Sequence, residues 1–174
     1  MRYLAIVALS LLFRAVTLAQ SSTLTPRPLD PIAVETYANA VAGSAVVRGL
    51  VERLEASNVI VHIVTSTPMP AGIGGTTQFV TSRGGYRYLR ITIGADLASR
   101  LRSAILGHEL QHACEIADSS ADDAASMREL FEQEGHRAGP YFETRAAIQT
   151  ERKVRFELMT GRALQAQPVA KFNH

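Results

Sequence analysis

Two histidines and a glutamate in His108-Glu109-Leu110-Gln111-His112 fit the pattern H-E-x-x-H. On an α-helix, residues four positions apart lie on one face, so the two imidazoles can bind one tetrahedral zinc ion. Glu109 is turned by about 100° from His108 around the helix axis, which places its carboxylate beside the metal rather than among its ligands. There it can take a proton from a zinc-activated water and return it later. The pattern therefore predicts a zinc centre with Glu109 as the catalytic general base.

A helix must carry this motif, and the surrounding residues favour one. Asp96 is a candidate N-cap for a helix that runs to Asp118. The apolar positions of this helix are Leu97, Leu101, Ile105, Leu110, Ala113 and Ile116. After a polar break at residues 118–123, we expect a helix over 124–133, a loop over 136–140 and a last helix over about 142–161.

Upstream of the motif, the spacing of apolar residues predicts one helix and then three strands. Apolar residues three and four positions apart predict a single amphipathic helix over 32–57. Strands are expected at 59–64, 76–82 and 86–93, the first buried on both faces and the last two joined by a turn at 83–85. The fold class is therefore α+β, a small three-stranded twisted sheet with the motif helix and further helices packed on it.

The stretch GHELQHACEIA, followed some thirty residues later by FETRAA, resembles the zincin clan of metallopeptidases. It is most similar to small bacterial exported proteins with a HELQHA-type helix. The resemblance covers residues 58–161 by the order of their elements. It implies a minimal zincin-like fold with a sheet beside the motif helix, zinc bound by His108 and His112, and Glu109 as the base. It also implies an edge strand that binds an extended peptide, which we place at Gln78, Phe79 and Val80.

A catalytic zinc usually takes three protein ligands and leaves one position for water. A glutamate on a following helix completes the site in the gluzincin branch, which implies Glu143 at the start of the last predicted helix. The metzincin branch takes a ligand six positions after the second histidine, here Asp118, but it has a glycine where this chain has Glu115. A helix that continues through Glu115 directs Asp118 away, and Glu115 is better placed to orient His112. We predict His108, His112 and Glu143 as the metal ligands, with Asp118, Glu115, Glu151 and His136 as alternatives.

Other polar residues near the motif have simpler interpretations. His62 lies in a hydrophobic strand and is expected to be structural. Cys114 is expected to be a small core residue beside the motif, although a thiol so near zinc could become an inhibitory ligand. Tyr141 or His136 could donate a hydrogen bond to the oxyanion, or could simply belong to the loop that contains them.

The N-terminus has the features of a signal peptide. Arg2 precedes an apolar run from Tyr3 to Phe13, which is too short to span a bilayer, and small residues follow near Ala19. We predict a signal peptide at 1–20, a flexible lead-in at 21–31 and a single domain at 32–174. The protein is then exported, to the periplasm or outside the cell, with no stable membrane insertion after cleavage.

Charge and cysteine content narrow the function classes. The chain carries a formal net charge of +2, and loss of Arg2 and Arg14 with the signal peptide leaves the domain near neutral. A neutral domain has no strong basic field for nucleic acid, so no nucleic-acid partner is expected. Cys114 is the only cysteine, which excludes an intramolecular disulfide.

These observations predict a zinc-dependent metallohydrolase, namely a peptidase that cleaves amide bonds of a peptide or protein substrate. The alternative is a non-catalytic zincin-like domain that is exported and binds metal or a partner protein. A structural exported domain in which the motif occurs by chance is the third hypothesis, and it predicts no stoichiometric zinc.

Overall fold

A computed structural model describes residues 25–138 and 141–165 of the chain. The predicted signal peptide at 1–20 lies outside the described residues. Along the chain the elements are β1 (Arg27–Pro28), α1 (Pro31–Gly43), α2 (Ala45–Glu55), β2 (Val59–Ser66), β3 (Gly75–Arg83), β4 (Tyr86–Gly94), α3 (Ser99–Ala117), α4 (Ala124–Glu134), β5 (His136–Ala138), β6 (Tyr141–Glu143) and α5 (Arg145–Gln165). The predicted α+β class is confirmed.

The larger sheet has the strand order β1-β2-β4-β3. Strands β1, β2 and β4 run parallel, and β3 runs antiparallel to β4. Because β3 is last in the strand order, it is an edge strand, as predicted. The turn between β3 and β4 uses Gly84 and Gly85, whose φ angles of 60° and 81° are favourable for glycine. The three predicted strands are confirmed, and β1 adds a fourth.

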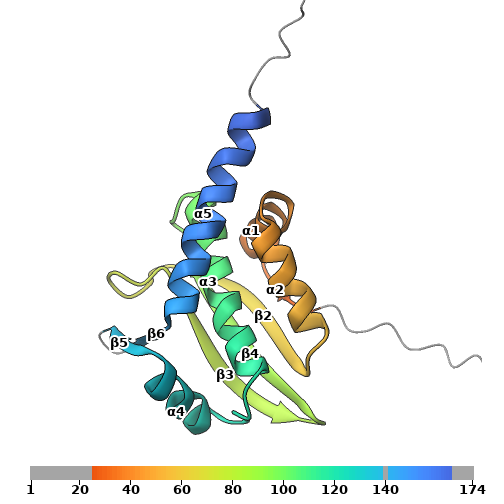
Figure 1. The fold of residues 1–174 in the computed structure, drawn as a ribbon, viewed down its shortest axis with the longest axis vertical. Helices are drawn as coiled ribbons and strands as arrows, with labels where there is room; N and C mark the ends of the chain where they lie inside the picture. Colours follow the sequence, from red (N-terminus) through yellow and green to blue (C-terminus); the bar gives the residue numbers. More distant parts are fainter. Residues whose placement is uncertain (1–24, 139–140, 166–174) are drawn as a thin grey trace, which may run out of the picture.

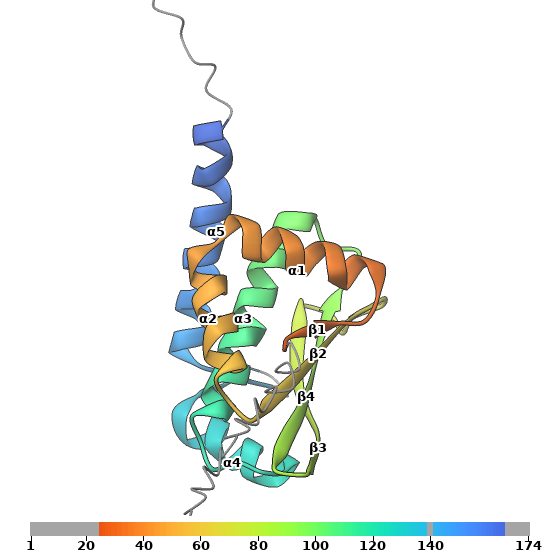
Figure 2. The same ribbon diagram turned by 90° about the vertical axis from the view of Figure 1, so that its right-hand side faces the viewer.

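The helices lie on one face of this sheet, with α3 between the sheet and α5 (Figures 1 and 2). On β4 the side chains of Leu89, Ile91 and Ile93 are buried toward the helices, whereas Arg90 is exposed on the opposite face. Strand β2 is buried on both faces only at its start, because His62 and the residues from 64 onward are half-buried. No helix within the described ranges has both the length and the apolar character needed to cross a bilayer.

The single helix predicted over 32–57 is wrong, because the chain forms α1 and α2 with a break at Ser44. The backbone of Ser44 is extended, and its buried hydroxyl accepts a hydrogen bond from the Val47 amide and donates one to Glu157 on α5. Ser44 is therefore the N-cap of α2. The apolar spacing continues across the break, which is why periodicity alone did not reveal it.

The flexible lead-in predicted over 21–31 is also wrong for its described part. Residues Arg27 and Pro28 pair with β2 as strand β1. Asp30 is the N-cap of α1: it accepts hydrogen bonds from the Ala33 amide and from both the amide and the hydroxyl of Thr65. This carboxylate fixes the start of α1 to the end of β2.

Two predicted helix starts also need correction. Helix α3 begins after Ala98 without a side-chain cap, and Asp96 lies outside it in the preceding turn. The last helix begins at Arg145 rather than at 142, because the Thr144 hydroxyl accepts a hydrogen bond from the Ala147 amide and caps α5 there. The segment predicted as a loop at 136–140 contributes β5, which pairs antiparallel with β6.

Candidate metal centre

Helix α3 carries the motif through the core of the molecule. Leu106, Leu110 and Ala113 anchor it among buried apolar side chains, and the same helix presents His108, Glu109 and His112 with only 7%, 5% and 5% of their surfaces exposed. Gly107 allows α5 to approach, since a Cβ at this position would lie 2.8 Å from the nearest methyl carbon of Val154. The motif is thus held rigidly between the sheet and α5.

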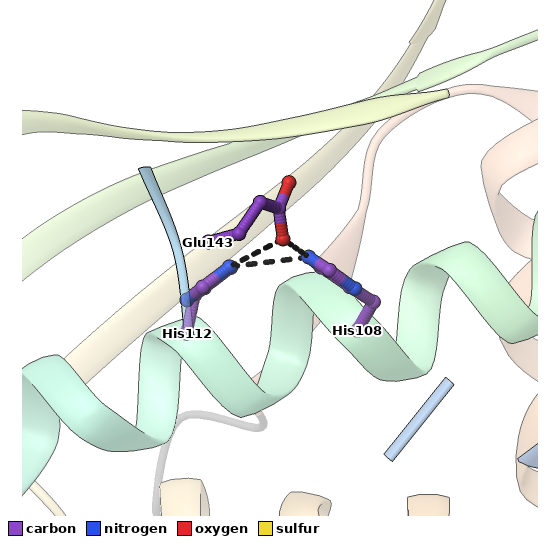
Figure 3. Close-up of side chains that lie close together, drawn as sticks. All are labelled: His108, His112 and Glu143. Atoms are coloured by element: carbon purple, nitrogen blue, oxygen red, sulfur yellow. Dashed lines mark hydrogen bonds and ion pairs between the residues drawn. The ribbon is translucent and has the colours of Figure 1, made fainter. Parts of the chain in front are cut away.

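Glu143 completes a compact group with the two histidines (Figure 3). Its Oε2 atom lies 2.9 Å from His108 Nε2 and 3.9 Å from His112 Nε2, and the two Nε2 atoms are 3.1 Å apart. Ligand atoms about 2.1 Å from a tetrahedral zinc ion are roughly 3.4 Å from one another, so these separations bracket the spacing that zinc requires. Glu143 Oε2 is buried and faces the two imidazole nitrogens, as expected for an oxygen directed at a shared cation.

The position of Glu143 comes from the β5–β6 hairpin and not from a helix, which corrects the predicted location. Glu143 is the last residue of β6 and pairs with His136 on β5. Gly135, just before β5, permits the close approach of these segments, because a Cβ there would lie 2.8 Å from the Phe131 carbonyl oxygen and 2.9 Å from that of Glu143. The short hairpin therefore brings the carboxylate over the face of α3 that carries the histidines.

A carboxylate lies behind each imidazole ring. His112 Nδ1 is 2.9 Å from Glu115 Oε2, and His108 Nδ1 is 3.5 Å from Glu151 Oε2. The other oxygen of Glu115 accepts a hydrogen bond of 2.8 Å from the Thr144 hydroxyl, next to Glu143. Carboxylates at Nδ1 turn Nε2 toward the centre and increase its basicity as a ligand. Glu115 thus orients His112 through a hydrogen bond, whereas Glu151 lies at ion-pair distance from His108 Nδ1, and neither belongs to the group of three.

The remaining ligand candidates lie elsewhere. Asp118 is exposed and forms an ion pair of 2.6 Å with Arg53 at the end of α3. His136 has an exposed side chain on β5 and is not part of the group of three. These positions leave Glu143 as the carboxylate that meets both histidines.

Glu109 lies beside the centre in a tight site made by β3. Its Oε2 accepts a hydrogen bond of 2.8 Å from the Thr77 hydroxyl. A Cβ at position 75 would lie only 2.8 Å from Glu109 Oε1, so Gly75 leaves the room that this carboxylate needs. Burial raises the pKa of Glu109 against the opposing effects of His112, His108 and the Thr77 hydrogen bond. A raised pKa suits a carboxylate that must accept a proton and then give it up.

The histidines and carboxylates of the centre strongly shift one another's pKa values in the absence of a cation. Burial disfavours the charged form of His108, but its ion pairs with Glu143 and Glu151 outweigh burial and raise its pKa to about 10. Burial likewise opposes charge on Glu143, yet its contacts with both histidines lower its pKa to about 2. Glu115 and Glu151 also have lowered pKa values, so they stay ionised behind the imidazoles. The surplus of negative charge around two imidazoles favours a bound cation.

Two clefts meet at the centre and share Ile73, Gly75, His108, Glu109 and Glu143. The cleft on the His112 side has a volume of about 490 Å³ and runs between β3, α4 and the β5–β6 hairpin. The cleft on the other side has a volume of about 610 Å³ and is bounded by the 68–75 loop, the start of α3 and α5. Together they form a groove that runs along the first half of β3 on one side of the motif and along the 68–75 loop on the other.

The edge strand offers free backbone groups to this groove. The Gly94 amide donates to the Gly74 carbonyl, so residues 74, 76 and 78 form the hydrogen-bonded pairs with β4. Because such pairs alternate in an antiparallel ladder, the amides and carbonyls of Gly75, Thr77 and Phe79 point away from β4. A bulge follows at Val80 and ends the regular register.

The remaining polar residues largely match their interpretations. Cys114 is buried, and burial raises its pKa to about 12, as expected for a core thiol. His62 is half-buried on β2, outside the centre. Tyr141 lines the cleft on the His112 side, whereas His136 lines neither cleft.

Sequence reasoning did not find Thr77, Thr144 or Arg87. Arg87 is 8% exposed and donates to the carbonyls of Ile116, Ala117, Ser119 and Ala121 and to the side chain of Asn58. It therefore binds the C-terminus of α3 to the sheet. The burial of Arg87 could have been predicted from the sequence, because Arg87 lies two and four positions before Leu89 and Ile91 and so shares the inward-facing side of β4. The two threonines have no comparable signal.

Comparison of the chain with protein-family models, curated proteins and solved structures gives no match. The function is therefore inferred from the residues of this centre and their geometry.

Proposed function

We propose that the protein is a zinc-dependent metallohydrolase, a zincin-like peptidase that cleaves amide bonds in an extended peptide. The observation that carries the proposal is the convergence of His108 Nε2, His112 Nε2 and Glu143 Oε2 on one point beside the buried carboxylate of Glu109. Two imidazole nitrogens and one carboxylate oxygen are a donor set of catalytic zinc, which leaves a fourth position for water and substrate.

Bound zinc would polarise the scissile carbonyl and make a water acidic near neutral pH. The chain supplies the proton transfer: Glu109 accepts the proton of the attacking water and later delivers it to the leaving amine. Thr77 holds one oxygen of Glu109, which leaves the other oxygen for this transfer. Glu115 would keep the His112 imidazole directed at the metal, and the negative charge of Glu151 lies behind the His108 imidazole.

The groove along β3 supports a peptide as the substrate. An extended peptide could add to the free edge of β3 through the outward-facing backbone groups of Gly75, Thr77 and Phe79. Its middle would then lie over Glu109, since the motif is at the centre of the groove. Side chains on either side of the scissile bond would occupy the two clefts.

The first experiment measures zinc content and affinity together with cleavage of a peptide library. Wild type is expected to bind one zinc per chain. Glu143→Ala should lose affinity by two orders of magnitude or more, because one of three ligands is removed. Glu109→Gln should keep the zinc and lose cleavage, because its amide cannot accept the proton. Asp118→Ala is the matched control and should change neither zinc affinity nor cleavage, since Asp118 pairs with Arg53 away from the centre.

Absence of zinc from wild type after reconstitution would contradict the proposal. Zinc bound by His108, His112 and Glu143 without cleavage of any library peptide would leave the alternative, a metal-binding domain that does not cleave.

A further inference from the structure

The cleft on the His112 side has an apolar floor and a cationic rim. Phe79, Met127, Phe131 and Phe142 line the floor. The Phe131 ring packs edge-on against His112, with the ring centroids 5.1 Å apart, so this floor begins at a metal ligand. Arg128 on α4 and Arg137 on β5 are exposed at the rim.

The two rim arginines have no anionic partner within the part of the chain that the structure describes. Arg137 is held with its guanidinium 5.9 Å from the centroid of the Phe142 ring, and Arg137 and Phe142 are paired across β5 and β6. The positive charge of Arg137 therefore lies close to Phe142, the residue that precedes Glu143. Glu132 contributes one anion to the same rim, which leaves a surplus of positive charge.

The cleft on the other side of the centre has the opposite character. Its arginine, Arg155, forms an ion pair of 2.6 Å with Glu151, and Asp96 adds a further exposed negative charge. Both clefts share the carboxylates of Glu109 and Glu143, but the charges that line only one cleft differ in sign: they are in positive surplus on the His112 side and in negative surplus on the Glu151 side. A ligand in the groove would be oriented and selected by this difference.

We infer that the cleft on the His112 side selects peptides that carry a carboxylate next to a large apolar side chain. The inference rests on the proposed peptidase function and names its substrate class. The apolar side chain would lie on the phenylalanine floor, and Arg128 and Arg137 would bind the carboxylate, since the guanidinium fork matches carboxylate geometry. The carboxylate can belong to an aspartate or glutamate side chain or to the C-terminus of the peptide.

The test compares the zinc-loaded wild type with the zinc-loaded double variant Arg128→Glu/Arg137→Glu. The substrates are pairs of peptides, one with Glu and the other with Gln at a single position. That position is moved along the peptide on both sides of the scissile bond. Each pair is made with a free and an amidated C-terminus, which separates a side-chain carboxylate from a terminal one. We expect wild type to prefer a carboxylate at one position by about tenfold in kcat/KM, and less so at high ionic strength. The double variant should lose or reverse this preference, measured as the ratio of kcat/KM for the charged and neutral peptides of each pair at equal zinc content.

Arg90→Glu is the matched control, because Arg90 is exposed on the opposite face of the sheet and should leave the preference unchanged. Binding of the same peptides to zinc-loaded Glu109→Gln, measured by fluorescence anisotropy, tests selection without turnover. If wild type cleaves nothing, the peptidase proposal fails, while a binding preference that needs both arginines still supports the cleft assignment. Equal binding and cleavage of charged and neutral peptides, or a preference that persists in the double variant, would overturn the inference.

Discussion

At the scale of single residues, the centre depends on hydroxyl groups as much as on the motif. Thr77 holds Glu109 Oε2, and Thr144 holds the Glu115 carboxylate that in turn orients His112. Each hydroxyl therefore acts on the chemistry through a charged neighbour. Such hydrogen bonds to ionised groups are stronger than those between neutral groups, so their loss is measurable.

Thr77→Val removes the hydroxyl with little change in volume and is expected to lower kcat about tenfold, because Glu109 loses the bond that orients it. Zinc stoichiometry and KM should stay near wild type, since Thr77 contacts no ligand of the metal. Thr77→Ser retains the hydroxyl and should retain most of kcat. Steady-state kinetics with metal analysis checks this prediction, and an equal loss of kcat in both variants would show that Thr77 only packs β3 against α3.

At the scale of elements, two connections place the proposed ligands: the Thr144 junction between β6 and α5, and the contact of Arg87 with the end of α3. Thr144 caps α5 and binds Glu115 on α3 with the same hydroxyl. Arg87 connects β4 to α3 through main-chain carbonyls. The position of Glu143 relative to the histidines is therefore set by contacts between elements far apart in the sequence.

Thr144→Val is expected to weaken zinc affinity about tenfold, because both the start of α5 and the Glu115 carboxylate lose a partner. It should also reduce the free energy of unfolding of the metal-free protein by about 1 kcal/mol through loss of the N-cap. Competition with a chelator of known zinc affinity measures the first effect and urea unfolding the second. Thr144→Ser is the control, and unchanged zinc affinity in Thr144→Val would contradict a role for this junction in the metal centre.

Arg87→Met is expected to reduce the free energy of unfolding by roughly 3 kcal/mol, because the carbonyls at the end of α3 lose their buried donors. The exposed Arg90→Met on the same strand should change it by less than about 0.5 kcal/mol. Urea unfolding of the metal-free forms compares the two variants. Similar stabilities for both would mean that water replaces the guanidinium at no cost.

At the scale of the whole molecule, the proposed metal binding and the stability of the fold should both depend on the protonation of the two histidines. In the metal-free protein the pKa of His108 is about 10 instead of its usual 6.5, because of Glu143 and Glu151. The raised value means that the folded state binds a proton that the unfolded state releases. The resulting stability is fully present below pH 6.5 and is lost as the pH rises toward 10.

The melting temperature of the metal-free protein should therefore fall between pH 6.5 and pH 10. Zinc requires neutral imidazoles, so its affinity, and with it the stabilisation that zinc provides, should rise over the same range. Calorimetry with zinc and with a chelator should show two curves that move apart as the pH rises. Glu143→Gln removes the main partner of His108 and should make the metal-free curve less steep. A slope should remain, because burial lowers the pKa of His112 but its contact with Glu115 helps to raise that pKa to about 9. A flat wild-type curve would contradict this account.

The sequence by itself determined the motif, the α3 and α4 segments, the β3–β4 hairpin and the α+β class, because these features follow from local spacing and turn residues. It also pointed to Glu143, through a resemblance rather than through geometry. Tertiary structure decided the rest. The break at Ser44, the strand at Arg27–Pro28 and the β6 position of Glu143 depend on partners more than thirty residues away or on a hairpin that no periodic pattern marks. The roles of Thr77 and Thr144 likewise exist only where β3 and the β6–α5 junction meet α3, because a hydroxyl becomes a positioning group only through the carboxylate that packing places beside it.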